Sequence, residues 1–350
     1  MKAESEYHAD IQFVLQKPTD WAPAGFVIAS NQLTIKPASS GKKSKSSVAS
    51  LKLQRSDKDF TVIAGQTKLV VGNTGRGGLL SLQYKGKELL EQPLLPDFTR
   101  PLTDNDRRGW KPQRKLKQWY EAVPQLVKTV ATESKQEIRI IAEYTMLADS
   151  ARLAIWYTIS PDGIVKLDYF LKADPALPNI PKIGMQMATR KEYRQIEYFG
   201  RGPLENYIDR RYGLDAGRYG QDIRDFIEPY AVPQENGNRT DVRWMFLHDT
   251  KSKEGLLIVA DSLLSMSAWP YTEENLSKAK HTNELKDAGY VTVNVDLIQM
   301  GVGGNDSWSE VAAPLEQYQI KAGSYHYSFY LVPLNGKIKS PEVRARELRD

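Results

Sequence analysis

The chain has 350 residues, of which 26% are charged and 41% are hydrophobic, an ordinary composition for a globular protein. Its net charge is +5, and part of that excess lies in the segment SSGKKSKSS, so nucleic acid is not an expected partner. No apolar run approaches the roughly 20 residues of a membrane span. There are no cysteines, which excludes disulfides and thiolate chemistry.

The first residues, MKAESEYHADIQF, lack the apolar segment of a secretion signal. Two strand-like runs follow, at 7–16 and 25–36. Two strands do not make a stable sandwich. Residues 1–36 are therefore interpreted either as the end of a domain whose body is missing, or as strands that join the next domain. The segment rich in Pro, Gly, Ser and Lys that comes next predicts a linker at 37–52.

Residues 53–335 consist of short alternating or β-branched runs separated by Gly, Pro, Asn and Asp, which predicts one large all-β antiparallel sandwich. A hairpin is predicted within 152–173, with its turn at Pro161-Asp162-Gly163. Helical patterns are few. Residues 271–286 predict a polar helix with Thr272 as its N-cap, and 336–350 form a tail with at most a helical turn. Further strands are predicted at 60–65, 67–73, 137–146, 254–261, 289–300 and 324–334.

Two stretches, 198–220 and 230–247, alternate acids with arginines. Paired carboxylates near aromatic residues suit the acid and nucleophile of a glycosidase. Every acid here has an arginine within six residues, however, so ion pairs and turn anchors that stabilise loops are the favoured interpretation. The acids are Glu205, Asp209, Asp215, Glu235 and Asp241, and the arginines are Arg201, Arg210, Arg211, Arg239 and Arg243.

The segment DFTRPLTDNDRRGW at 97–110 groups Asp104, Asn105 and Asp106. Their oxygens could bind a hard cation, but the spacing lacks the glycine and distal glutamate of a calcium loop. Such side chains more often anchor turns, and a loop anchor is favoured over a metal site. None of the histidines has zinc spacing; they are His8, His248, His281 and His326.

The segment GVGGNDSWSEV at 301–311 places a tryptophan in a loop. Its glycines permit unusual backbone angles, and Asn305, Asp306 and Ser307 favour turns. Trp308 then has two interpretations, between which the residues alone do not choose. The indole either plugs the underside of its own loop, or stands at the rim of the sandwich as a platform for the C–H face of a sugar.

Five segments, in this order and spacing, closely resemble the C-terminal part of the large bacterial β-galactosidases of glycoside hydrolase family 2: FTRPLTDND, FGRGPLENYIDR, PYAVPQENGNR, MGVGGNDSWS and AGSYHYSFYL. Residues 7–36 resemble the last strands of the immunoglobulin-like domain that precedes that part. The resemblance implies a super-sandwich with a galactose-mutarotase-like fold, and a role in retaining hydrolysis of terminal β-D-galactosides such as lactose. It also implies that Trp308 stacks on the galactoside substrate.

In that family both catalytic glutamates lie in an upstream (β/α)₈ barrel of the same polypeptide, and Mg and Na bind mainly around it. Such a barrel needs about 250 residues of alternating strand and helix, which this chain lacks. We therefore expect a C-terminal fragment without catalytic residues, metal or cofactor of its own, inactive alone and able to form a homo-oligomer. A cytoplasmic and a periplasmic location are both compatible with the sequence.

The sequence leaves two alternatives to this role open. One is a stand-alone carbohydrate-binding or mutarotase-like protein, which needs a histidine and a carboxylate in a cleft. His248 and His326 are the better candidates, although neither lies in a loop with an evident acid partner. The other is a domain that serves assembly only.

Overall fold

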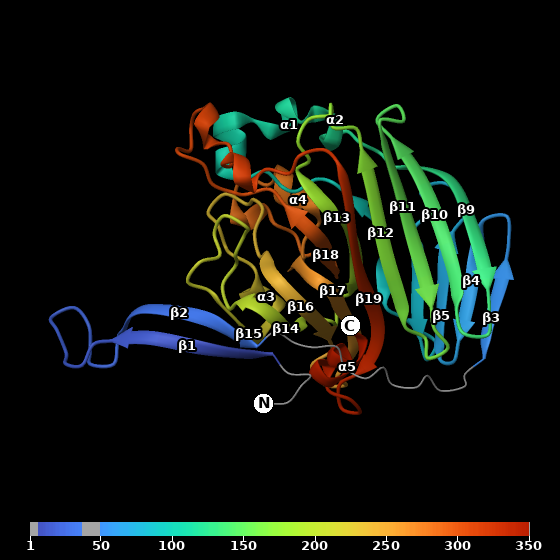
Figure 1. The fold of residues 1–350 in the computed structure, drawn as a ribbon, viewed down its shortest axis with the longest axis horizontal. Coiled ribbons are helices and arrows are strands. Elements are labelled where there is room, and N and C mark those ends of the chain that lie inside the picture. The colour runs from blue at the N-terminus through green and yellow to red at the C-terminus, as the bar shows by residue number, and fades with distance from the viewer. Residues whose placement is uncertain (1–5, 37–49, 350) are drawn as a thin grey trace.

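The computed structural model describes residues 6–36 and 50–349. An N-terminal hairpin, formed by β1 (Tyr7–Val14) and β2 (Val27–Lys36), extends from a large antiparallel β body (Figure 1). The predicted linker at 37–52 falls mostly on residues 37–49, outside the described part. Among the described residues, no helix has the length and apolar character needed to span a membrane.

The strands of the body follow the hairpin in chain order. The first group is β3 (Leu51–Arg55), β4 (Asp59–Ala64), β5 (Thr67–Gly72), β6 (Leu79–Tyr84), β7 (Lys87–Glu88) and β8 (Leu90–Asp97). The second is β9 (Gln125–Glu133), β10 (Ile138–Met146), β11 (Ala151–Ile159) and β12 (Val165–Ala173). The third is β13 (Lys182–Arg190), β14 (Gln195–Gly202), β15 (Asp215–Asp222), β16 (Arg239–His248), β17 (Glu254–Trp269), β18 (Tyr290–Gln299) and β19 (Ser324–Asn335).

The helical segments are short and lie between strands or at the end of the body. They are η1 (Asn105–Trp110), α1 (Pro112–Lys115), α2 (Lys117–Tyr120), α3 (Ile223–Phe226), α4 (Glu273–Lys278), η2 (Thr282–Glu284), η3 (Glu310–Ala312), η4 (Glu316–Tyr318) and α5 (Pro341–Leu348). The segment η1 is π-helical and the other η segments are 3₁₀ turns.

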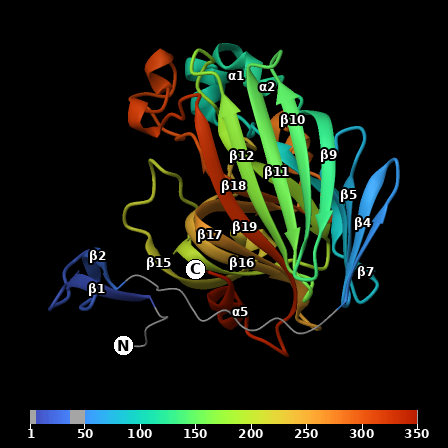
Figure 2. The same cartoon turned by 45° about the vertical axis from the view of Figure 1, so that its right-hand side comes forward.

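The order of the ladders explains the shape of the body. One wall runs β9–β10–β11–β12–β19–β17–β16–β14–β15, and the other runs β17–β18–β13–β8–β6–β5–β4–β3. The 16-residue strand β17 belongs to both, because its first half pairs with β19 and its second half with β18. The walls wrap into an almost closed super-sandwich, as Figures 1 and 2 show.

The predicted alternation places the core between these walls. In β10 the side chains of Ile138, Ile140 and Ala142 point inward and are fully buried, while the residues between them face outward. Partners on β11 continue the same layer, since Tyr157 pairs with Ile140 across the ladder. The core therefore follows from the period-2 pattern of these strands, and the all-β sandwich prediction is confirmed.

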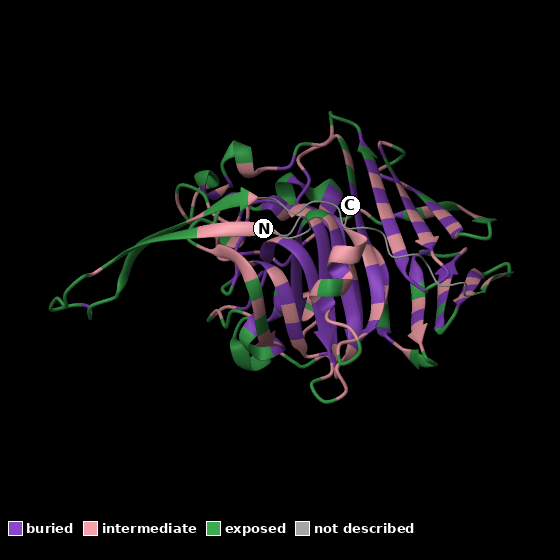
Figure 3. Cartoon of the chain, turned by 60° about the horizontal axis from the view of Figure 1, so that its bottom comes forward, coloured by how far each residue is buried: buried purple, intermediate pink, exposed green. Residues whose placement is uncertain are grey.

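The hairpin β1–β2 does not join the sheets of the body, so the interpretation of residues 1–36 as borrowed strands is wrong. It forms a separate two-stranded sheet that extends away from the buried body (Figure 3). Its link to the body includes Gln32, whose amide accepts from Ala216 N at 2.8 Å and donates to Ala216 O at 3.0 Å. Glu6 also forms an ion pair with Arg243.

Two predicted helical segments differ from expectation in length. Thr272 caps α4 by accepting from Asn275 N at 3.0 Å, as predicted, but the helix ends at Lys278. The chain folds back there because the Asn275 side chain donates to Glu284 O at 3.2 Å and accepts from Lys286 N at 2.8 Å. In the predicted tail, α5 is a full helix, and Ala345 is buried in an apolar cluster with residues of β16 and β17.

Candidate functional site

The loop that carries Trp308 lies between β18 and β19, at the upper left of Figure 1. The indole is 76% exposed, so the interpretation of Trp308 as a hydrophobic plug is wrong. The backbone around it is nevertheless fixed. Asp306 Oδ1 accepts from Trp308 N at 3.2 Å and from Ser309 N at 3.0 Å, and Asp306 Oδ2 accepts from Ser309 Oγ at 2.6 Å. The loop thus presents a large aromatic face from an ordered backbone.

The base of this loop is held by Asp209, which projects from the 203–212 loop. Its Oδ2 accepts from Val302 N at 2.8 Å and from Gly303 N at 2.9 Å. Gly301 leaves the necessary room, because a Cβ there would lie 2.5 Å from Asp209 Oδ2. Asp209 is therefore a backbone anchor of a loop, one of the two roles predicted for these acids, and does not form an ion pair among the described residues.

Arg100, which forms a buried ion pair with Asp106 inside the 97–110 segment, joins this segment to the base of the Trp308 loop. Arg100 donates to Met300 O at 2.6 Å and to Gly301 O at 2.9 Å, and lies 3.3 Å from Asp106 Oδ2. Asp106 also accepts from Thr103 N at 3.0 Å and from Trp110 Nε1 at 2.9 Å. The loop-anchor interpretation of Asp106 is confirmed.

The neighbouring acid, Asp104, is also a loop contact. Its backbone N–H donates to Gln234 Oε1 at 3.0 Å, and its carboxylate lies 3.4 Å from Gln234 Nε2. The Asn105 amide donates to Asp306 O at 3.4 Å, which brings this segment against the Trp308 loop. Over the described ranges, no three or more His, Asp or Glu side chains gather in a way that could hold a metal.

Ion pairs account for part of the acid–arginine cluster, as predicted. Asp241 lies between Arg201 Nε at 2.5 Å and Arg211 at 3.2 Å. Glu205 contacts Arg210 and the Tyr230 hydroxyl, and accepts from Gly237 N at 2.8 Å. These carboxylates hold the loops of 198–241 together, and each is paired with arginine.

Three further members of the cluster have partners that lie outside it. Arg243 pairs with Glu6 of the hairpin, and the Arg239 guanidinium lies 4.2 Å from the centre of the Phe226 ring. Glu235 is only 3% exposed and lies 3.4 Å from both the Tyr207 hydroxyl and Gln299 Nε2. Burial raises the pKa of Glu235 to about 8. Sequence spacing could not predict these contacts, because the partners lie elsewhere in the chain, from Glu6 to Gln299.

The two histidines considered for mutarotase chemistry do acquire carboxylate neighbours. His248 Nε2 lies 3.3 Å from Glu197, and His326 Nε2 lies 3.8 Å from Asp168. Both carboxylates sit on adjacent strands, which the sequence could not show. The His248 side chain is completely buried, and the His326 ring stacks on Phe170 at 4.4 Å.

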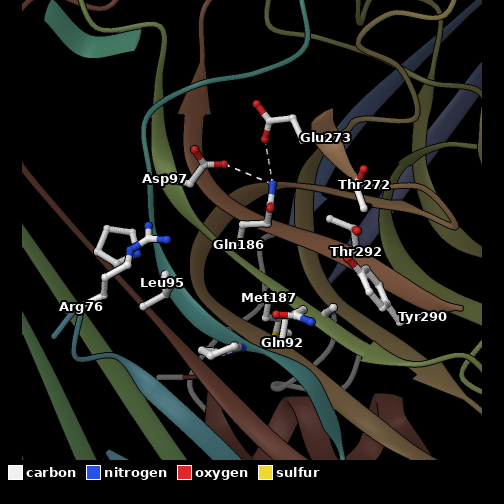
Figure 4. A pocket seen from close by; sticks show the side chains of 13 residues that line it. Arg76, Gln92, Leu95, Asp97, Gln186, Met187, Thr272, Glu273, Tyr290 and Thr292 are labelled. Atoms are coloured by element: carbon white, nitrogen blue, oxygen red, sulfur yellow. Dashed lines mark hydrogen bonds between the residues drawn. The ribbon is translucent and has the colours of Figure 1, made fainter. Parts of the chain in front are cut away.

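Sequence reasoning missed a polar cleft of about 360 Å³, bounded by β8, β13, β18 and the start of α4. Its polar lining includes Asp97, Gln186 and Glu273, which converge in Figure 4. Neither His248 nor His326 is among its lining residues. The cleft therefore lacks the imidazole that the mutarotase alternative requires.

The family model and the sequence relatives of this chain point to the same family. A family model described as beta galactosidase small chain matches residues 64–331. A beta-galactosidase of Priestia megaterium is 32% identical over 332 residues, covering 94% of this chain and 32% of the relative. One of Halalkalibacterium halodurans is 30% identical over 329 residues, covering 92% of this chain and 32% of the relative.

Among solved structures, a galactose 1-epimerase of Lactobacillus acidophilus matches 82% of this chain and 99% of its own, with 9% identity and a TM-score of 0.40.

The chain spans about a third of the length of the beta-galactosidases to which it is similar. The family model covers most of the sandwich, including the Trp308 loop. On this match, the chain belongs to the beta-galactosidase small-chain family.

Proposed function

We propose that this chain is the substrate-lining part of a β-galactosidase, a retaining hydrolase of terminal β-D-galactosides such as lactose, and that Trp308 stacks on the bound galactoside. The exposed indole on an ordered loop is the observation that carries the proposal. An aromatic face binds the C–H face of a sugar, and the indole N–H can donate to a hydroxyl. Because the loop is held by Asp306 and Asp209, little conformational entropy is lost when the sugar binds.

The catalytic acids belong, in this proposal, to a (β/α)₈ barrel outside the chain. A retaining glycosidase needs a nucleophile and a general acid about 5–5.5 Å apart on either side of one bond. Here Glu205, Asp209 and Asp241 are held by loop contacts, and Glu235 is sealed from solvent. The relatives are long enough to contain such a barrel, since this chain covers only 32% of each.

The Mg and Na ions of the family are assigned to that same catalytic part. The described residues of this chain do not fit a divalent metal site, because they offer no cluster of three or more His, Asp or Glu side chains. The role proposed for this chain consists of binding and orienting the galactoside.

We also propose that β1 and β2 are the last strands of an immunoglobulin-like domain. Large apolar side chains project from the hairpin into solvent, among them Phe13, Trp21 and Ile35. A sandwich would bury such a face. Acrylamide quenching of Trp21 fluorescence tests this, using variants in which Trp21 is replaced by Phe to isolate its signal. Trp21 should be quenched in the chain alone and protected in the complete enzyme; equal quenching in both would contradict the domain assignment.

The division of labour is tested by assaying the isolated 350-residue chain with o-nitrophenyl β-D-galactoside. No hydrolysis above background is expected, because nucleophile and general acid are both absent. Adding the barrel part of the enzyme should restore turnover. Hydrolysis by the isolated chain, retained after active contaminants are excluded by gel filtration, would overturn the proposal.

A further inference from the structure

The polar cleft of Figure 4 shares no residue with the Trp308 loop and has no role in the function proposed above. Its volume of about 360 Å³ lies within the range of small-molecule sites. Arg76 stands at one side, while Thr272, Tyr290 and Thr292 line the other. The cleft is thus lined by both hydrogen-bond donors and hydrogen-bond acceptors.

The Gln186 amide, on β13, lies among more acceptors than it can satisfy. Its Nε2 is 2.9 Å from Glu273 Oε2, 3.0 Å from Asn294 Oδ1 and 3.3 Å from Asp97 Oδ2. An amide nitrogen carries only two hydrogens. Lys182 Nζ also donates to Asp97 Oδ2 and to Asn294 Oδ1, so these acceptors already have donors. Each carboxyl oxygen keeps a second lone pair, with which it can accept from a ligand hydroxyl that reaches the cleft.

Beneath these groups lies a buried charge cluster. Lys182, 1% exposed, donates to Asp97 at 2.6 Å and to Asn294 Oδ1 at 3.1 Å. Asp296, also 1% exposed, directs a carboxyl oxygen toward the same ammonium at 3.9 Å. Neither oxygen of Asp296 has a hydrogen-bond partner within the part of the chain that the structure describes. Asp296 does not itself line the cleft, so it contributes to the charge of the cluster and is not a ligand contact.

The charge balance of the cluster favours an uncharged ligand. Burial raises the pKa of Asp296 well above its ordinary value. Burial, followed by repulsion from Asp97, raises the pKa of Glu273. Both shifts are toward the uncharged acid, and Asp97 is paired with Lys182 at 2.6 Å.

Because Arg76 adds a positive charge at one side, a cation gains little in such a cleft, whereas a hydroxyl-rich molecule can donate to its oxygens and accept from Arg76 and the Thr272 hydroxyl. The Thr292 hydroxyl donates to Tyr271 O at 2.7 Å, so it can only accept from a ligand.

We propose that this cleft binds a free monosaccharide, a neutral polyhydroxylated ligand, at a site separate from the one that Trp308 serves. Sugar hydroxyls donate to the carboxyl oxygens of Asp97 and Glu273 and accept from Arg76. Thr272 and Thr292 complete the hydrogen bonding on the opposite wall.

Methyl NMR of the complete chain, labelled at its methionines, tests the site. Met187 lines the cleft and serves as the reporter, assigned through Met187→Leu. The titration uses a Trp308→Ala background, so that the loop cannot contribute. D-galactose or D-glucose should shift the Met187 signal saturably, with a Kd of about 1–10 mM.

Glu273→Ala should weaken this binding by about tenfold or more, because an acceptor is lost. Glu274→Ala is the matched control: it lies on the same helix turn, but is exposed and pairs with Lys278. Its affinity should equal that of the parent. If Glu273→Ala does not fold, Arg76→Ala replaces it, because Arg76 lies at an exposed position of the lining and is the proposed donor to the sugar; the same weakening is expected.

Three results would each overturn the proposal. The first is a Met187 signal that neither sugar moves. The second is equal sugar affinity in the parent and in the folded cleft variant. The third is saturation by n-butylamine without saturation by either sugar, which would show that the cleft selects a cation.

Discussion

Glu235 is a carboxyl group held inside the protein, and this has a consequence for stability. Burial raises its pKa from 4.5 to about 8, so the folded state keeps a proton that the unfolded state loses as the pH rises. Between these two values the unfolded chain binds fewer protons. The free energy of unfolding must therefore fall as the pH rises through this window.

This can be measured by urea denaturation at several pH values from about 5 to about 8. The chain should lose stability across the range, with a slope of at most about 1.4 kcal/mol per pH unit from Glu235. Glu235→Gln, which stays neutral, should flatten the profile. Glu228→Gln, at an exposed position nearby, should leave it unchanged. A Glu235→Gln profile as steep as that of the parent would contradict this assignment.

At the scale of a single element, Trp308 and Asp306 have different roles within the Trp308 loop. The indole is proposed to touch the sugar, whereas Asp306 holds the backbone from within by accepting from Trp308 N, Ser309 N and Ser309 Oγ. Asp306 is therefore a positioning residue. Losing it should free the loop without removing the aromatic face.

In the complete enzyme, Asp306→Ala should raise the KM for a galactoside several-fold, because the three hydrogen bonds that order the loop backbone around Trp308 are lost. Asp306→Asn keeps one acceptor oxygen and should recover part of the effect. A purely structural role would instead lower the melting temperature and leave KM intact. Steady-state kinetics combined with thermal denaturation distinguish these outcomes.

The elements also show which parts of the fold the sequence could predict. Strands such as β10 and β11 alternate cleanly, so their positions and their inward faces could be predicted. Strand β13 could not, because Lys182 and Gln186 occupy one face and Ile183 and Met185 the other, and nearly all are buried. The polar residues of β13 are buried against charged partners that only the tertiary structure supplies.

The candidate sites, likewise, could be predicted only where local sequence carries the signal. Glycines and turn formers predicted the Trp308 loop from local sequence, and its role at the substrate is a proposal that rests on the family motifs. The cleft gave no local signal, since Gln186 meets Asp97 across 89 residues of sequence and Glu273 across 87. Likewise Arg100 reaches Met300 O across 200 residues. Contacts of this range are created by strand order, which residue spacing does not contain.

At the scale of the whole molecule, the super-sandwich brings distant loops together at one end. Segments 97–110, 203–212 and 300–311 are fixed to one another by Arg100, Asp106 and Asp209. The sheets supply rigidity, and the loops supply the exposed aromatic side chain. On the proposed function, this end of the body faces a galactoside whose reacting atoms are contacted by another part of the enzyme.

Steady-state hydrolysis of a β-galactoside by the complete enzyme carrying Trp308→Ala tests this most directly. Stacking on an aromatic face contributes on the order of 1–3 kcal/mol, by analogy with base stacking, and about 1.4 kcal/mol corresponds to a factor of ten. KM should rise about tenfold or more, while Trp308→Phe, which keeps an aromatic face, should stay near the parent. If KM and kcat are both unchanged in Trp308→Ala, the indole does not contact the substrate.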